Sequence, residues 1–513
     1  MNNLDANVIS LEPIIDFSII FMAHPRLLSN PHLRARLAEL FESLIPFRKS
    51  KNQNLFTRDS EWNESASLFN MHNRTALIEK CSQPDGILKD AVRSLICAFV
   101  SIELMPGSGE STTTAAEEAI TQGRNTNAEE RPRNIENVQI AAIGFEEKFQ
   151  YRRPVYACLK YWNDKEFYTK QLANLQSSAL DHIEDQEPPL MLQFLSLLIN
   201  DVTFLLDEGF SLLAQMKTKE QERIQSGGRF STQNEEVLFQ HTGRLTSHHL
   251  SLGTDTVAAL KDLTAHCSKI LTHSILVDRL ACMLNYFLDR LVSEKRKEIS
   301  VRDKTLYKFN PVHILCEICQ IYIQLGVEIV DQDSVKSFNQ AIVTDERSYS
   351  EDNFEEAVKV LEMINFDSSI IEKFKSFIIN IKAEKKNYSE NYLDDLEDIP
   401  DEFCDPIMGV LMKDPVILPT SNKILDRKTI YRHLLSDTTD PFNRKHLKMS
   451  DLIPDLELKK RIEDWIAERR VKLPGNRYQQ SAPCRQIEFE EASQYVINMN
   501  PLFDQSFKMG LNL

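Results

Sequence analysis

The chain has 513 residues, which is enough for more than one domain, and its 42% hydrophobic and 27% charged residues are typical of a globular protein with a packed core. The formal net charge of −16 opposes contact with a phosphate backbone, so the composition argues against nucleic-acid binding. Nine cysteines scattered over this length do not form a dense disulfide framework, which indicates a reducing compartment.

The N-terminal half predicts helices and no targeting or membrane segment. Residues 1–5 lack the basic start and apolar run of a signal peptide. Helical periodicity begins after Asn30-Pro31, a capping residue followed by proline, and five apolar residues then recur at three- and four-residue steps: Leu33, Leu37, Leu40, Phe41 and Leu44. The strongest apolar segment, 191–215, is too polar to span a bilayer. Four residues interrupt it: Asn200, Asp201, Asp207 and Glu208.

Helical periodicity continues to about residue 390. The predicted stretches are 87–104, 135–151, 190–216, 255–292, 311–325, 353–363 and 369–383. Successive helices with short polar breaks predict a stacked-helix solenoid of the armadillo or HEAT kind, and a compact helical bundle is the alternative. The scaffold is therefore expected at 1–390, with disordered polar loops near 106–134 and 217–244. An acidic linker follows at 384–400.

Two clusters in the scaffold suggest metal chemistry but fit a structural role better. Cys316 and Cys319 form a C-x-x-C pair inside an apolar helical run, and no second pair follows. His248, His249, His266 and His273 lie among helical residues, where metal binding is the weaker interpretation. We expect neither a metal nor a cofactor.

A distinct C-terminal module is predicted at 391–470, with a flexible tail at 471–513. Residues 403–412 and 436–446 read as two loops rich in Asp and Pro. Between them we expect a strand at 414–419, a return strand at Ile424-Leu425 and a short helix at 427–435 capped by Asp426. A last helix begins after Pro454-Asp455, and its apolar stripe consists of Leu458, Ile462, Trp465 and Ile466.

The plan of loop, strands, helix and loop is that of a RING finger, but its metal ligands are missing. Two structural zinc ions need eight Cys or His ligands, and residues 398–470 offer only Cys404, His433 and His446. A polar network could hold the loops instead, through charge-assisted hydrogen bonds. The candidates are Asp405, Thr420, Ser421, Asp426, Arg427, Asp440, Asn443 and Arg444. The alternative is that these residues merely follow turn preferences.

The loops also carry apolar side chains, namely Ile407, Met408, Leu411 and Pro441. They form either local core or an exposed patch that binds a partner through a small apolar anchor.

Four motifs of the module carry a resemblance to the U-box, the zinc-free relative of the RING finger: D-E-F-C-D-P-I-M at 401–408, M-K-D-P-V-I-L-P at 412–419, D-R-K-T-I at 426–430 and H-L-L-S-D-T-T-D-P-F-N-R at 433–444. The chain resembles the ubiquitin conjugation factor E4 family, of the ubiquitin fusion degradation type, over roughly 20–470. Stretches 30–35, 198–208 and 345–350 carry the likeness in the scaffold. Family members are usually much longer, so the scaffold corresponds to a truncated E4 core. Gly409 departs from the family, whose members carry a larger or polar side chain there.

The resemblance implies roles for particular residues. Ile407, Leu434 and Pro441 would contact a ubiquitin-conjugating enzyme. Arg444 would be the linchpin that hydrogen-bonds both the conjugating enzyme and its bound ubiquitin, a role that suits a rigid, always charged guanidinium. A loop-bracing salt bridge is the alternative role for Arg444.

The implied function is that of a U-box ubiquitin-protein ligase or chain-elongation factor, with no covalent ubiquitin intermediate on this chain. The implied partners are a ubiquitin-charged conjugating enzyme, ubiquitin, ubiquitinated substrates and, more remotely, an AAA ATPase segregase and the proteasome pathway, in the cytoplasm or nucleus. Two alternatives stay open. One is a non-enzymatic helical adaptor with a degenerate U-box, and the other is a ligase that carries ubiquitin on Cys404.

Overall fold

A computed structural model describes residues 12–44, 87–102, 148–227 except 184 and 186, 233–392 except 346, and 399–472 except 436. The chain forms two compact units. The first comprises residues 1–183 and 189–382, and the second comprises 184–188 and 383–513. The sequence predictions of a loop at 106–134 and of a flexible tail lie outside the described residues, apart from the start of the tail.

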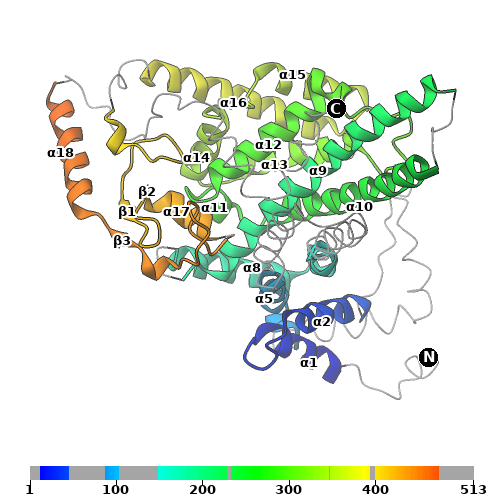
Figure 1. Ribbon diagram of the computed structural model, residues 1–513, viewed down its shortest axis with the longest axis horizontal. Helices are drawn as coiled ribbons and strands as arrows, with labels where there is room; N and C mark the ends of the chain where they lie inside the picture. The colour runs from blue at the N-terminus through cyan, green and yellow to red at the C-terminus, as the bar shows by residue number, and fades with distance from the viewer. Residues whose placement is uncertain are drawn as a thin grey trace, which may run out of the picture. The chain divides into compact units, whose positions relative to one another are not determined.

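The first unit begins with helices that pack on their neighbours in the chain. These are α1 (Glu12–Ala23), α2 (Pro31–Leu44), η1 (Ile87–Asp90) and α5 (Ala91–Ile102) (Figure 1). The predicted start of α2 is confirmed, because the Asn30 side chain accepts hydrogen bonds from the backbone N–H groups of His32 (2.9 Å) and Leu33 (3.3 Å).

A long pair of antiparallel helices follows residues 148–162 and α8 (Glu166–Asp181), which are also helical. The pair is α9 (Leu190–Gln225) and α10 (Gln233–Thr264), which run side by side in Figure 1. A Cβ at Gly209 of α9 would lie 2.7 Å from Leu250, and one at Gly253 of α10 would lie 2.8 Å from Leu206. Each glycine thus admits a leucine of the opposite helix, which lets the two backbones approach closely.

The predicted loop at 217–244 was wrong over most of its length. Helix α9 continues to Gln225 and α10 begins at Gln233. The segment is polar, but its Lys, Glu, Gln and Arg residues are good helix formers. Pairing with the other helix supports this exposed end, where Arg223 of α9 lies 3.9 Å from the Glu236 carboxylate of α10.

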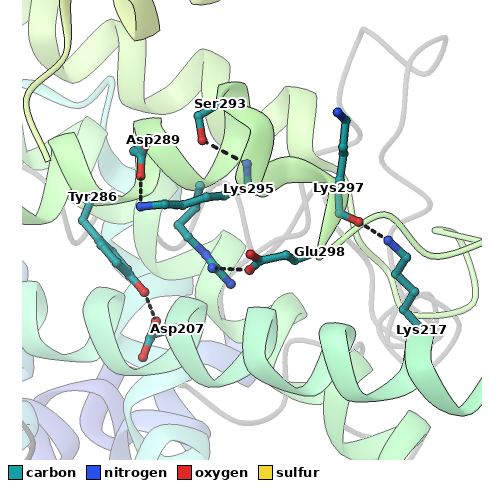
Figure 2. Close-up of polar contacts among 9 residues, drawn as sticks. Asp207, Lys217, Tyr286, Asp289, Ser293, Lys295, Lys297 and Glu298 are labelled. Atoms are coloured by element: carbon teal, nitrogen blue, oxygen red, sulfur yellow. Dashed lines mark hydrogen bonds and ion pairs between the residues drawn. The ribbon is translucent and has the colours of Figure 1, made fainter.

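Two of the four polar interruptions of α9 have hydrogen-bond partners inside the body. Asp201 is 2% exposed, and its carboxylate accepts hydrogen bonds from Arg152 Nη1 (2.5 Å) and the Tyr156 hydroxyl (2.9 Å). Asp207 accepts a hydrogen bond from the Tyr286 hydroxyl at 2.5 Å (Figure 2). These pairings explain how an apolar core helix tolerates carboxylates. By length and composition α9 could cross a membrane, but 67% of its apolar window is buried within the protein, as in a core helix.

The remaining helices of the first unit follow α10. They are α11 (Ser268–Leu271), α12 (Val277–Val292), η3 (Glu294–Lys297), α13 (Pro311–Ile323), η4 (Gln324–Glu328), α14 (Gln332–Val343), α15 (Glu351–Met363) and α16 (Ser368–Tyr392). Among them, η3, α13, α14 and α15 pack on α12, and the last, α16, extends past the end of this unit at residue 382. Asn285 of α12 is 1% exposed, and it donates to the Ile342 carbonyl (3.0 Å) and accepts from the Tyr322 hydroxyl (2.9 Å). Helices close in sequence pack together, as the solenoid prediction expects. The predicted continuous stretch 255–292 is divided among α10, α11 and α12.

The second unit contains the C-terminal module. Its elements are η5 (Asp401–Phe403), β1 (Pro415–Ile417), β2 (Ile424–Asp426), α17 (Arg427–Leu434), η6 (Met449–Asp451), β3 (Ile453–Pro454) and α18 (Leu456–Lys472). The three-stranded antiparallel sheet has the order β2-β1-β3. The predicted hairpin, both helices and the stripe of α18 are confirmed, whereas β3 was not foreseen. The fold class is thus a mostly helical body and a small α+β module.

Candidate functional site

The first loop of the module, residues 403–412, is organised by Asp405. This side chain is fully buried, and its Oδ1 accepts hydrogen bonds from the backbone N–H groups of Ile407 (2.8 Å) and Met408 (3.0 Å). Its Oδ2 accepts from the backbone N–H of Asp426 at 2.8 Å. One carboxylate therefore shapes the turn and ties it to the end of β2.

Asp426 extends this connection. It is the N-cap of α17, where its Oδ1 accepts from Lys428 N (3.0 Å). Its Oδ2 accepts from the backbone N–H groups of Lys413 (2.6 Å) and Asp414 (3.1 Å), which precede β1. The end of the first loop, both strands and the helix thus meet at two buried carboxylates.

The second loop, residues 437–446, is organised by Asp440, which is also fully buried. Its Oδ1 accepts from the Phe442 backbone N–H (2.8 Å), and its Oδ2 accepts from the Thr420 hydroxyl. Asn443 donates from Nδ2 to the Thr420 carbonyl (2.8 Å). Both contacts reach the turn between β1 and β2, so this loop is held by the hairpin.

The predicted polar network differs from the observed one in two ways. The contacts found tie each loop to the hairpin instead of bracing one loop against the other. Ser421 does not join the network, since its buried Oγ finds no hydrogen-bond partner within the described residues. Thr420 supplies the hydroxyl instead, because it is Thr420 that lies beside Asp440.

Arg427 braces the base of the hairpin. Its Nε donates to the Asp414 carboxylate, which Lys459 Nζ of α18 also approaches, at 2.9 Å. Burial alone would raise the pKa of Asp414, but the hydrogen bonds from Lys459 and Arg427 outweigh it and hold the pKa below its usual value.

The three potential zinc ligands, Cys404, His433 and His446, each make separate local contacts. His433 Nε2 lies 2.8 Å from the Thr439 carbonyl, a contact to the second loop that the sequence did not indicate. Cys404 pairs with Leu411 and His446 with Thr439 in isolated β-bridges, one in each loop. No group of three His, Cys, Asp or Glu side chains suited to a metal ion occurs in the part of the chain that the structure describes.

Apolar side chains of both loops reach the surface. Met408 is 49% exposed and Phe442 is 38% exposed, while Ile407 and Pro441 are half-buried. Ile407 packs against the module's core but is also partly exposed. It therefore combines the two roles considered for the apolar loop residues, local core and exposed patch. Phe442 was not singled out from the sequence, although it follows the Asp-Pro pair of its loop just as Ile407 does in the first loop.

The structure places Leu434 differently from its predicted role. Leu434 is 7% exposed and belongs to the core, together with Val416, Leu418, Leu425, Ile430, Leu447 and Leu452. It lies one turn after Ile430 on α17, so the face that buries Ile430 buries Leu434 as well. Little of its surface is available to a partner.

Arg444 is exposed and has a left-handed backbone with φ of +58°. Its backbone N–H donates to the Asp440 carbonyl (2.8 Å), which fixes the main chain. Its guanidinium forms no ion pair within the described residues, so the alternative role as a loop-bracing salt bridge finds no support there.

Comparison with known proteins agrees with this architecture. The family model for the ubiquitin elongating factor core matches residues 1–105 and 138–382, and the U-box domain model matches 399–471. Ubiquitin conjugation factor E4 A of Bos taurus is 33% identical over 474 residues, which are 91% of this chain and 39% of that protein. The probable ubiquitin conjugation factor E4 of Arabidopsis thaliana is 31% identical, with 90% and 39% covered. E4 ubiquitin-protein ligase UFD2 of Saccharomyces cerevisiae is 38% identical over 53% of this chain and 28% of its own length.

The chain thus spans about two fifths of the length of the first curated relatives it matches. The family model covers well over half of the chain, and the module's two braced loops occupy the range that the U-box model matches. The chain belongs to the ubiquitin elongating factor core family and carries a U-box domain after that core.

Proposed function

We propose that the protein is a U-box ubiquitin ligase that extends ubiquitin chains. Its U-box would recruit a ubiquitin-charged conjugating enzyme and promote transfer to a lysine of a substrate or of ubiquitin already attached to it. The lysine amine attacks the thioester carbonyl, and the thiol of the conjugating enzyme leaves. No atom of this chain bonds to ubiquitin in that step.

One observation carries the proposal: the same two loops that are fixed by buried carboxylates expose the apolar and cationic side chains. Asp405 shapes the loop of Ile407 and Met408, and Asp440 shapes the loop of Phe442 and Arg444. A surface of this kind has an apolar anchor and a polar rim. Because its loops are already ordered, little conformational entropy is lost when a partner binds.

Arg444 would act by positioning. A ubiquitin tethered by a flexible thioester samples many orientations, and only some bring the carbonyl to the amine. A guanidinium that donates to both proteins would hold the reactive orientation, and orientation alone can lower a barrier by several kcal/mol. Its fixed backbone supports this role, as does a guanidinium that has no ion pair in the described part of the chain.

The names of the relatives describe conjugation factors and a ligase, which supports the proposed activity, and the wider context is proposed from the family resemblance. We place the protein in the cytoplasm or nucleus, working on substrates that already carry ubiquitin. An AAA ATPase segregase and the proteasome pathway would be its further partners.

The test is a reconstituted reaction of the full chain with activating enzyme, a panel of conjugating enzymes, ubiquitin and ATP. We expect chain growth, and weaker conjugating-enzyme binding for Met408→Ala and Phe442→Ala, by about 1–3 kcal/mol. Both residues are exposed, so the fold should survive. The matched control is Leu456→Ala, which removes a 73% exposed side chain of the same domain outside the loops.

Absence of ubiquitin transfer with every conjugating enzyme, with the fold intact, would favour the adaptor alternative with a degenerate U-box. A reducible ubiquitin adduct on the chain that disappears in Cys404→Ser would favour the covalent alternative. Equal losses for the two loop variants and Leu456→Ala would remove the loops from the interface.

A further inference from the structure

A segment of the helical body carries charge opposite to the rest of the chain. Residues 293–310, here called the basic connector, join α12 to α13 and contain six Lys or Arg and three Asp or Glu, in a protein of net charge −16. The cationic residues are Lys295, Arg296, Lys297, Arg302, Lys304 and Lys308. Such a local reversal of sign creates a positive surface potential on an acidic protein.

The connector is anchored on the α9–α10 pair by its aromatic residues. Tyr307 is fully buried, its ring lies 3.5 Å from where a Cβ of Gly243 would be, and its hydroxyl donates to Glu220 Oε1 (2.8 Å). Glu220 Oε2 accepts from the Arg302 backbone N–H at 3.3 Å. Phe309 is 5% exposed and meets the ring of Phe210 edge-on, with centroids 5.7 Å apart. The loop therefore has a defined shape.

The start of the connector is held on the same stretch of α9. Figure 2 shows Lys217 of α9 donating from Nζ to the Lys297 carbonyl. Ser293 caps η3 by accepting from Lys295 N (3.1 Å), and Lys295 Nζ donates to Asp289 at 2.7 Å. Lys217 and Glu220 lie one helical turn apart, so the backbone at Lys297 and at Arg302 rests on one side of α9.

The outward face of the connector combines free cations with an exposed leucine. Leu306 is 62% exposed and alternates with the buried Tyr307, which in turn is followed by the exposed Lys308. Lys308 has a left-handed backbone with φ of +52°, a strained conformation for a lysine. Within the described residues, the side chains of Arg302, Lys304 and Lys308 form no ion pair. Lys295, Arg296 and Lys297, by contrast, are each paired with a carboxylate.

From this arrangement we propose that the basic connector binds an acidic peptide that carries a large apolar side chain. Arg302, Lys304 and Lys308 meet its carboxylates, and Leu306 meets the apolar side chain. Charge complementarity identifies the partner, because these cations and the leucine are exposed on the same loop, whose shape is already fixed. A nucleic acid or an anionic membrane is a poorer fit, since an extended polyanion would be repelled by the net charge of −16 of the whole chain. This site is independent of the U-box and of its proposed activity.

The test measures fluorescence anisotropy of a labelled 12-residue peptide of Asp and Glu with one central Phe, titrated with the full chain. We expect saturable binding that weakens as salt increases. Arg302→Glu, Lys304→Glu and Lys308→Glu together should weaken it by about tenfold or more. Leu306→Ser should weaken binding of this peptide but not of a version in which Ser replaces Phe. Tyr307 and Phe309 stay in place, and circular dichroism checks the fold.

The matched control is Lys89→Glu, Lys160→Glu and Lys336→Glu together, which makes the same change in charge at exposed lysines outside the connector. We expect the control to bind the peptide as wild type does. Equal losses in both triple variants would show that only net charge matters and would overturn the proposal. Absence of saturable binding, or tighter binding of a 20-nucleotide single strand or of phosphatidylserine vesicles than of the peptide, would overturn it as well.

Discussion

Asp405 and Asp440 occupy equivalent positions in two loops with the same backbone pattern. In each loop the aspartate Oδ1 accepts from the N–H two residues later, at 2.8 Å, and the aspartate carbonyl accepts from the N–H four residues later, also at 2.8 Å. The aspartate N–H donates to the carbonyl five residues later, at 2.8 Å for Asp405 and 2.7 Å for Asp440. The fourth residue after each aspartate has a positive φ. The module thus uses one Asp-Pro turn twice, with the other carboxylate oxygen facing the hairpin.

This equivalence predicts loop-specific effects of Asp405→Asn and Asp440→Asn. In Asp405→Asn an amide nitrogen faces the backbone N–H of Asp426, which leaves that buried donor unsatisfied at a cost of about 1–3 kcal/mol. In Asp440→Asn the Thr420 hydroxyl turns to accept from the amide, so the loss is the charge of the acceptor in that hydrogen bond. Hydrogen exchange of the full chain should become about ten- to a hundred-fold faster at the amides of Ile407 and Met408 in the first variant. In the second variant it should become faster at Phe442.

Each variant serves as the control for the other, because each loop is tied separately to the hairpin. If either substitution accelerates exchange equally in both loops, the loops depend on one another and the separate attachment inferred here is wrong.

The sequence indicated the carboxylates of the site better than their partners. Asp405, Asp426 and Asp440 were expected from residue type and clustering, since buried loops without metal need charged acceptors. Which hydroxyl faces Asp440 depends on the path of the hairpin turn, so the sequence could not separate Thr420 from Ser421. Leu434 was predicted to contact the conjugating enzyme, but it lies in the core. The prediction came from the family resemblance, which does not show how deeply α17 buries that position.

The fold likewise has features that the sequence predicted and features that it did not. Periodicity predicted the apolar helices, but it missed the helical character of residues 217–225 and 233–244, which are supported by pairing of α9 with α10 rather than by an apolar stripe. The close approach at Gly209 and Gly253 depends on which leucine lies opposite each glycine. That register follows from tertiary packing, which no local window contains.

The fourth residue after each aspartate has a left-handed backbone, and in the first loop this residue is Gly409. We therefore expect the loss of stability on substitution of Gly409 to depend on how well the new residue tolerates a positive φ. The φ of Gly409 is +64°, and a Cβ built there meets no atom within 4 Å, so backbone strain alone decides the cost. Gly409→Ala should lose about 1–2 kcal/mol, and Gly409→Asn less, because asparagine tolerates this region better. Hydrogen exchange of the β1–β2 amides in the full chain measures the loss. Equal stability of the alanine variant and wild type would show that the loop adopts another backbone conformation in solution.

The polar bracing predicts that the U-box keeps its stability without zinc. Excess chelator should leave the thermal unfolding midpoint of the full chain unchanged, because buried carboxylates and hydrogen bonds occupy the positions that organise both loops. A stoichiometric zinc ion found by metal analysis of the purified protein, or a midpoint lowered by chelator, would contradict this expectation.

Burial of His249 predicts a loss of stability in mild acid. Desolvation lowers the pKa of this histidine from 6.5 to about 4, and burial also lowers that of its neighbour His248. The folded state therefore favours the neutral ring. The stabilisation is complete above about pH 6.5 and declines as the pH falls toward 4, by up to about 3 kcal/mol for His249. His249→Gln should reduce the change in the free energy of unfolding, measured with urea, between pH 7 and pH 5. His241→Gln, at an exposed position of the same helix, should leave this pH dependence as in wild type. If the free energy of unfolding changes equally with pH in wild type and in both variants, the His249 ring is not held neutral by burial.

Arg444→Ala should separate catalysis from recruitment. If the guanidinium acts on the charged conjugating enzyme, its loss removes hydrogen bonds made in the reactive complex and leaves ground-state binding nearly unchanged. A loss of roughly 1.5–3 kcal/mol corresponds to about ten- to a hundred-fold in rate. Single-turnover discharge of ubiquitin to free lysine gives the rate, and titration with the uncharged conjugating enzyme gives the affinity. Arg444→Gly controls for the left-handed backbone, since glycine tolerates the +58° φ without strain and should lose the same rate. Discharge at the wild-type rate in both variants would remove Arg444 from the reaction, and loss of affinity together with loss of fold would assign it to the structure of the second loop.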